Sequence, residues 1–281
     1  MKFFLSGLGN HGNDLDVIVK MVLEADQLGF NGAIMPDHYM WGERNWSQSP
    51  NNSTLETWVT LTYLAGKTEQ IHLGTLVTPI PFRPPGILAK MISTLDILSA
   101  GRVLLGVGAG WSREEFEGYS EWSPPKVRVD KTKEGLELMI KLWTLDEVTF
   151  EGKYYNVKGA VLEPKPVQKP YPPLLFGGRG DQMLKLAGRY ADICYPLPRE
   201  YKKGKKQVLN AAKKLNRADK ISFMAGSLST TDPYNEEGYF KKIEDAIDLG
   251  ASYFLTPFPH NINRVKAMRK FAKDVMPSFV S

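Results

Sequence analysis

The sequence predicts an α/β fold in which eight parallel strands close into a (β/α)8 barrel, the TIM barrel. Short apolar runs typical of buried strands recur along the chain, and amphipathic helical patterns separate them. Strands that alternate with helices pair in parallel through right-handed crossovers. Eight such units in 281 residues fit this barrel, whose usual length is about 250 residues. A doubly wound open sheet is the alternative that the pattern alone leaves open.

The predicted elements follow one another regularly. The strands cover residues 3–5, 32–35, 71–77, 103–107, 174–176, 192–195, 221–225 and 253–256. The helices cover residues 15–28, 55–68, 85–98, 131–143, 181–190, 201–215, 236–249 and 262–275. Asp14 can cap the first helix and Gly29 can end it. Ser53-x-x-Glu56 is a capping box at the start of the second helix, which gives Glu56 a structural role.

One segment, residues 146–173, interrupts this alternation. It begins with a predicted strand pair, Val148-Thr-Phe-Glu-Gly-Lys-Tyr-Tyr, and continues as a proline-rich passage from Glu163 onward. Proline fixes φ and removes a hydrogen-bond donor, so this passage is a stiff extended connector. We expect residues 1–281 to form a single domain, with residues 146–173 inserted between the fourth and fifth strands, where they could cover part of the site.

The composition is that of a soluble globular protein, with 42% hydrophobic and 24% charged residues. No apolar run approaches the roughly 18 residues of a membrane span. The start of the chain has too short an apolar stretch for a signal peptide and is typical of a first strand. The single cysteine, Cys194, excludes an internal disulfide and suits a reducing compartment. We therefore expect a cytoplasmic protein with no membrane association.

The formal charge of +5 is modest and comes largely from one lysine-rich helical pattern. Lys202-Lys203-Gly204-Lys205-Lys206 is followed by Lys213-Lys214, which is typical of a solvated helix face. Because no aromatic residues are interleaved with these lysines, we expect no nucleic acid partner. A mild positive field favours a small anionic ligand instead.

An acid–imidazole pair ends the second predicted strand, in Gly32-Ala-Ile-Met-Pro-Asp37-His38-Tyr39. The carboxyl ends of strands are where α/β proteins bind ligands. Imidazole exchanges protons near neutral pH, and a neighbouring carboxylate can hold its tautomer and orientation. Asp37 and His38 are therefore candidate catalytic residues. The alternative is that Asp37 caps the next turn and His38 is a residue of the barrel rim.

Other candidates also follow strand ends. Three of the four histidines fall on neighbouring units of a closed barrel: His11 after the first strand, His38 after the second and His260 after the eighth. Such a cluster raises the possibility of a metal hydrolase. The sequence has no His-x-His or helical His-x-x-x-His spacing, so we expect no metal. We expect four residues at the barrel mouth to line a substrate pocket: His11, Trp41, Trp111 and His260.

Two glycine-rich loops follow the fourth and fifth predicted strands. The first is Gly106-Val-Gly108-Ala-Gly110, and the second is Gly177-Gly178-Arg179-Gly180 directly before a helix. Glycines at a strand end let backbone N–H groups approach a phosphate or a flat ring. The second loop adds a helix N-terminus and a guanidinium that favour an anion. The alternative is a pair of tight strand–helix turns; two such clusters on adjacent strands favour a shared ligand.

The chain resembles the bacterial luciferase-like superfamily of flavin and deazaflavin oxidoreductases over nearly its whole length. The resemblance depends on the order and spacing of several short motifs, each weak alone. They are Ala25-Asp-Gln-Leu-Gly-Phe, Pro36-Asp-His, Leu73-Gly-Thr-Leu-Val-Thr-Pro, Asp96-Ile-Leu-Ser-Ala-Gly-Arg-Val-Leu-Leu-Gly-Val-Gly-Ala-Gly-Trp-Ser-Arg-Glu-Glu-Phe, Leu142-Trp-Thr, Val148-Thr-Phe-Glu-Gly-Lys-Tyr-Tyr, Pro164-x-Pro-x-Gln-x-Pro, and Gly177-Gly-Arg-Gly with Ala187-Gly-Arg-Tyr-Ala-Asp.

The resemblance implies a (β/α)8 barrel that binds FMN or the deazaflavin coenzyme F420. The Asp-His end of the second strand is similar to the F420-dependent branch, which implies that His38 lies beside the ring carbon that carries hydride, with Asp37 as its companion. In that branch a non-prolyl cis peptide interrupts the third strand, here at Leu76–Val77. The implied cofactor-binding residues are Leu76, Val77, Thr78, Gly108, Ala109, Gly110, Gly177, Gly178, Arg179 and Gly180.

One departure limits what the resemblance implies. Sugar-phosphate dehydrogenases of this branch carry a proton-donating glutamate just after the fourth-strand glycines, where this chain has Trp111. Trp111 is expected to pack over cofactor or substrate instead. The leading hypothesis is hydride transfer between F420 and a small organic substrate. The alternatives are an FMN-dependent luciferase-like monooxygenase, a non-catalytic flavin-binding protein and a metal hydrolase. The resemblance also implies a homodimer.

Overall fold

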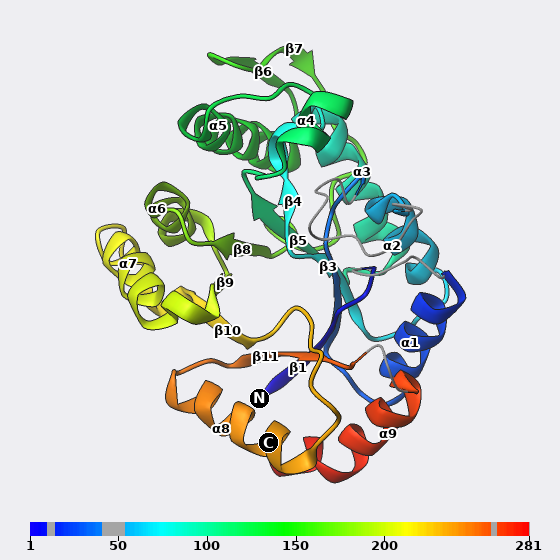
Figure 1. Ribbon diagram of the computed structural model, residues 1–281. Helices are drawn as coiled ribbons and strands as arrows, with labels where there is room; N and C mark the ends of the chain where they lie inside the picture. Colours follow the sequence, from blue (N-terminus) through cyan, green and yellow to red (C-terminus); the bar gives the residue numbers. More distant parts are fainter. Residues whose placement is uncertain (10–14, 41–53, 260–262, 281) are drawn as a thin grey trace.

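The computed structural model describes residues 1–9, 15–40, 54–259 and 263–280. Within these residues, parallel strands close into a barrel surrounded by helices (Figure 1). The strand order is β3-β2-β1-β11-β10-β9-β8-β5, and pairing of β3 with β5 closes the ring. The barrel strands are β1 (Lys2–Ser6), β2 (Gly32–Met35), β3 (His72–Thr75), β4 (Thr78–Pro79), β5 (Val103–Gly108), β8 (Leu174–Gly178), β9 (Ile193–Pro196), β10 (Ser222–Gly226) and β11 (Tyr253–Pro257). The predicted barrel is confirmed, and the open sheet is excluded.

The third predicted strand is built from two pieces. β3 and β4 are separated by a cis peptide bond between Leu76 and Val77, the position that the resemblance implied. β3 pairs with β5 through Leu73 and Gly74, and β4 pairs with β5 further along at Thr78. Both pieces therefore occupy one position in the barrel wall.

The helices lie on the outer side of the strands (Figure 1). They are α1 (Leu15–Gln27), α2 (Thr57–Ala65), α3 (Pro85–Leu98), α4 (Arg113–Tyr119), α5 (Pro125–Thr144), α6 (Asp181–Tyr190), α7 (Tyr201–Lys213), α8 (Glu236–Asp248) and α9 (Arg264–Asp274). Short 3-10 turns include η1 (Ile80–Phe82), η2 (Pro198–Glu200), η3 (Ala218–Lys220) and η4 (Met276–Ser278).

Three helix predictions need correction. α4 was not predicted, because its seven residues are mostly charged and show no apolar period. α5 begins at Pro125 rather than residue 131, since a proline at the first helical position starts it and its first turns are polar. α2 begins at Thr57, and Glu56 is its N-cap residue, with a carboxylate that accepts from Val59 N at 2.7 Å. Ser53 and Asp14 lie outside the described residues. Gly29, with φ of 80°, follows α1 as predicted.

The segment between β5 and β8 carries the expected antiparallel strand pair, β6 (Val148–Glu151) and β7 (Asn156–Ala160). The pair lies beyond α5, outside the ring of helices rather than over the barrel opening (Figure 1). The Glu134 carboxylate of α5 accepts hydrogen bonds from the backbone N–H groups of Lys153, Tyr154 and Tyr155 at 2.7–3.0 Å. This hairpin is therefore attached to the outer layer, and the expectation that it covers part of the site is wrong.

Side chains fill the barrel interior. They form a buried cluster that includes Phe4, Ile34, Leu104, Leu175, Met224 and Leu255. Glycine is required where the wall is tightest: a Cβ on Gly106 would lie 1.9 Å from the Thr75 carbonyl oxygen. Because the interior is packed, a ligand site must lie at the strand ends. Among the described residues, none of the helices combines the length and apolar character needed to cross a membrane.

Candidate functional site

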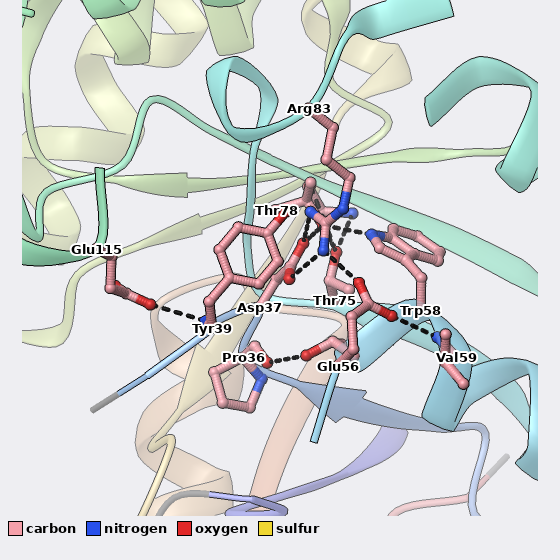
Figure 2. Close-up of polar contacts among 12 residues, drawn as sticks. Pro36, Asp37, Tyr39, Glu56, Trp58, Val59, Thr75, Thr78, Arg83 and Glu115 are labelled. Carbon is pink, nitrogen blue, oxygen red and sulfur yellow. Dashed lines mark hydrogen bonds and ion pairs between the residues drawn. The ribbon is translucent and has the colours of Figure 1, made fainter. Parts of the chain in front are cut away.

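Asp37, just beyond the end of β2, is a buried carboxylate at the centre of an ion-pair cluster (Figure 2). Arg83, between η1 and α3, donates from Nη1 to Asp37 Oδ2 at 2.7 Å and from Nη2 to Oδ1 at 2.9 Å. The Thr78 hydroxyl donates to Oδ2 at 2.8 Å. Two parallel N–H···O bonds of this kind are the strongest geometry available to a carboxylate and a guanidinium. Asp37 is thus held rigidly by neighbours from the third strand and beyond.

Arg83 is shared between several neighbours. Its Nη2 also donates to the Glu56 carboxylate, and its guanidinium lies over the Tyr39 ring, 4.8 Å from the centroid. Burial disfavours the guanidinium charge, but Asp37, together with Tyr39 and Glu56, outweighs this effect, and the pKa of Arg83 is raised. Burial also raises the pKa of Tyr39 to about 12, although Arg83 opposes that shift. Arg83 therefore stays charged and ties the end of β2 to the start of α2.

A buried hydroxyl network extends this cluster across the barrel wall. The Thr78 oxygen accepts from Trp58 Nε1 at 3.2 Å and lies 3.0 Å from the Thr75 oxygen. The Thr75 oxygen in turn accepts from Gly106 N at 3.1 Å. The Thr78 hydroxyl is thereby engaged by Asp37, Trp58 and Thr75, all within the protein. Thr78, predicted to contact the cofactor, is fully buried and serves to position Asp37.

The His38 imidazole lies beside Glu115 rather than being oriented by Asp37. His38 Nδ1 is 2.7 Å from Glu115 Oε2. Glu115 Oε1 accepts from the backbone N–H groups of Tyr39 at 2.9 Å and Met40 at 3.3 Å. The orienting role that the sequence analysis gave to Asp37 therefore belongs to Glu115, because Asp37 is committed to Arg83.

Glu115 was missed as a site residue, although a signal for it was present. It stands in the first turn of α4, immediately after the glycine-rich loop that follows β5. Its side chain is 1% exposed. A buried acid in the first turn of a helix at the carboxyl face of a barrel is placed to contact residues at neighbouring strand ends. Its target, His38, is 77 positions away in the sequence, so the pairing itself could not be predicted.

The ring of His38 has distinct roles for its two nitrogens. A carboxylate only accepts hydrogen bonds, so Nδ1 carries the proton that points to Glu115, and we assign this tautomer from the bond. In this tautomer Nε2 is the unprotonated ring nitrogen, which can accept a proton. His38 is half-buried and meets Trp111 edge to face, with ring centroids 5.8 Å apart. Trp111 is 51% exposed, so an imidazole and an indole stand together at the barrel mouth.

The glycines of the two loops serve different purposes. A Cβ on Gly108 would lie 2.3 Å from Val77 Cγ2, and one on Gly177 would lie 2.7 Å from Leu76 Cδ1. Gly110, with φ of 76°, would place its Cβ 2.4 Å from the Phe116 ring. These three glycines are required by packing, whether or not a ligand binds. Ala109 lies half-buried between two of them.

Gly178 to Gly180 is the part of the second loop that is open. A Cβ on Gly180 would have no atom within 4 Å, and one on Gly178 would have its nearest neighbour at 4.0 Å. Gly180 is the N-cap residue of α6 and has no side-chain capping bond. The first N–H groups of a helix without such a cap are donors for an anion. Arg179 is exposed beside them, so this stretch fits a phosphate group.

Three predicted pocket residues, His11, Trp41 and His260, lie outside the described residues. Within residues 1–9, 15–40, 54–259 and 263–280, no group of three or more His, Cys, Asp or Glu side chains is placed to hold a metal ion. The predicted residues that the structure does bring to the carboxyl face come from the ends of β2, β4, β5 and β8.

Comparison with known proteins agrees with this architecture. The model of the luciferase-like monooxygenase family matches residues 1–237. A solved F420-dependent secondary alcohol dehydrogenase, in complex with an F420-acetone adduct, has a TM-score of 0.86 and 22% identity, with both chains fully covered. The coenzyme F420-dependent tetrahydromethanopterin reductase from Methanopyrus kandleri has a TM-score of 0.81 and 20% identity, covering 99% of each chain. At these identities the structures show a shared fold.

The class defined by the fold is a (β/α)8 barrel with a site at the carboxyl ends of its strands. Within that class, the chain belongs to the luciferase-like monooxygenase family, since the family model covers most of its length. An F420-dependent glucose-6-phosphate dehydrogenase of Microbacterium testaceum is 34% identical over 169 residues, covering 60% of this chain and 48% of the relative. That of Nakamurella multipartita is 32% identical over 176 residues. The chain spans about half the length of these curated relatives.

The Asp37–Arg83 pair generates a prediction about stability. Asp37→Asn should lower the free energy of unfolding by about 3 kcal/mol, because it leaves a buried guanidinium short of one carboxylate. Chemical denaturation followed by circular dichroism measures the change. Asp130→Asn is the matched control, since Asp130 pairs with the exposed Lys126 and the loss should be small. Equal unfolding curves for Asp37→Asn and the unsubstituted protein would contradict the role assigned to this pair.

Proposed function

We propose that the chain is a coenzyme F420-dependent oxidoreductase that transfers a hydride between the deazaflavin and a small organic substrate. The observation that carries the proposal is the His38 imidazole, oriented by a buried carboxylate, at the mouth of a luciferase-like barrel. The names of the curated relatives and of two structural neighbours support F420 over FMN. We propose further that residues 1–281 act as one barrel domain, and that the single cysteine reflects a cytoplasmic location.

The open loop and the strand ends fit such a cofactor. Backbone N–H groups at the start of α6, with Gly178, Arg179 and Gly180, would hold its phosphate. The half-buried Val77, at the break in the third strand, would contact the ring together with Leu76. The bound deazaflavin would supply or accept the hydride, while the protein sets its position against the substrate.

The protein's own residues would control the proton that accompanies the hydride. His38 Nε2 would donate a proton to the substrate oxygen in reduction, or accept it in oxidation. Glu115 would hold the ring through Nδ1 and stabilise it when protonated. Trp111 offers an exposed indole face for packing against cofactor or substrate. On the sequence argument we retain His11, Trp41 and His260 as proposed pocket residues.

The cofactor proposal is tested by titrating the purified protein separately with F420 and FMN and following the absorbance of each. We expect tight binding of F420 and weaker binding of FMN. Gly180→Val should weaken F420 binding at least tenfold without loss of stability, because its Cβ meets no protein atom but would obstruct a phosphate. Gly178→Val is a poorer test, since φ of 147° strains any side chain there. Tight FMN binding with no affinity for F420 would overturn the proposal.

The catalytic role of His38 is tested by single-turnover hydride transfer. His38→Ala should lower the rate about 10²–10⁴-fold, the usual contribution of a positioned proton donor. F420 affinity should change by less than about tenfold, or about 1.4 kcal/mol. Glu115→Gln should cause a smaller loss of rate, because an amide can keep the contact but supplies no charge. If His38→Ala loses F420 binding yet reacts normally at saturating cofactor, His38 holds the ligand and is not catalytic.

We propose that the protein forms a homodimer through the outer face of α2 and α3. These helices enclose an apolar groove on the surface. Its lining includes Val59, Ile87, Met91, Leu95 and Leu98. Val59 is 67% exposed and Ile87 is 60% exposed. A contiguous apolar patch of this kind is typical of an interface, and a second copy could cover it by a twofold arrangement in which the same face meets itself.

The dimer proposal is tested by sedimentation equilibrium. The unsubstituted protein should be a dimer, and the Val59→Glu/Ile87→Glu variant should be a monomer, because burial of unpaired carboxylates at the interface is costly. Ile247→Glu, on the exposed face of α8, is the control and should leave the dimer intact. A monomeric unsubstituted protein would contradict the proposal.

A further inference from the structure

Arg264 is the first residue of α9. Its guanidinium lies at the carboxyl face of the barrel, near the ends of β1, β10 and β11. Its Nη2 donates to the Gly7 carbonyl, just past β1, at 2.9 Å. The position that a Cβ on Gly7 would occupy shows what surrounds this residue. It lies 3.2 Å from Arg264 Nη2, 3.4 Å from the Leu228 carbonyl oxygen and 3.9 Å from Pro257 Cβ. The guanidinium thus binds the backbone just past β1, next to residues that follow β10 and end β11.

The charge of Arg264 has no countercharge within the part of the chain that the structure describes. No acidic side chain there forms an ion pair with it, and its Nε is buried with no hydrogen-bond partner. Burial lowers the pKa of Arg264, which reflects the cost of keeping this cation out of water. Arg269, five residues further along α9, is by contrast exposed and paired with both oxygens of Glu24. Arg264 is the unusual case, because its guanidinium is half-buried and its charge has no acidic partner among the described residues.

The position of Arg264 relates it to the proposed catalytic residue. β1 pairs with β11 on one side and with β2 on the other, and His38 follows β2. Gly7 and His38 therefore follow adjacent strands. Arg264, which binds the Gly7 carbonyl, lies on the side of the barrel opposite to β8 and the glycine loop at the start of α6. An anion held at Arg264 would be separate from one held at that loop.

We propose that Arg264 binds an oxyanion group of the substrate, a carboxylate or a phosphate monoester. A planar guanidinium recognises such groups through paired N–H···O bonds, and the missing countercharge would arrive with the ligand. The substrate would then span the barrel mouth, with its reacting carbon near His38 and its anionic end at Arg264. The identity of the ligand as substrate rests on the proposed function. Oxyanion binding by Arg264 does not.

The test is a calorimetric titration of F420-loaded protein with inorganic phosphate and, separately, with acetate, at an ionic strength held constant with chloride. The loaded cofactor occupies its own phosphate site, so only a second site is measured. We expect saturable binding of at least one anion to the unsubstituted protein. Arg264→Gln should weaken it at least tenfold and Arg264→Lys less. Arg269→Gln, which removes a charge from the same helix, should bind as the unsubstituted protein does.

Each result decides the proposal. Equal anion affinity in the unsubstituted protein and Arg264→Gln, or no saturable binding in the former, overturns it. A loss of F420 affinity in Arg264→Gln also overturns it, because Arg264 then serves the cofactor. If F420 does not bind at all, the proposed function fails, and titration of the cofactor-free protein still compares Arg264→Gln with Arg269→Gln. Thermal unfolding checks that each variant is folded; if Arg264→Gln is not, Arg264→Lys against Arg269→Lys carries the comparison.

Discussion

The buried ion pair between Asp37 and Arg83 is the constraint on which the rest of the site depends. A carboxylate that is 1% exposed is costly unless it is paired, and the two N–H groups of Arg83 together with the Thr78 hydroxyl meet that requirement. The pair fixes where the chain goes as it leaves β2. His38 and Tyr39 come next in the sequence, so the Asp37–Arg83 pair positions their backbone. Asp37 itself has no part in the proton transfer proposed for His38.

Two acids near the end of β2, Asp37 and Glu115, therefore have different partners. Both oxygens of Asp37 are bound by the Arg83 guanidinium, and one also accepts from the Thr78 hydroxyl. Glu115 carries a single charge that is shared between His38 and two backbone N–H groups. It is therefore the carboxylate that is in direct contact with the His38 ring. Adjacent residues in sequence need not be partners in chemistry, because each side chain pairs with whatever the barrel brings to it.

The elements of the barrel could be predicted because apolar periodicity is local, whereas the partners within the site could not. Asp37 and Arg83 are 46 positions apart, and His38 and Glu115 are 77 apart. Their pairing depends on the register of β2, β3, β4 and β5 and on the start of α4. That helix is short and charged, so no periodicity marked it. The resemblance to a family supplied the break at Leu76–Val77, which no rule of local propensity would give.

The glycine loops show the same limit in a different form. Six glycines lie in the later parts of β5 and β8 or in the loops that follow these strands, and in the sequence they all permit close approach of a ligand. In the structure, the room beside Gly108 and Gly177 is already taken by Val77 and Leu76, while the room beside Gly180 is open. A glycine at a strand end therefore permits a close neighbour. Only the surrounding structure shows whether that neighbour is the protein itself or whether the space is open to a ligand. By that criterion the proposed phosphate site is at the start of α6, whereas the glycines of the loop after β5 make room for Val77 and Phe116.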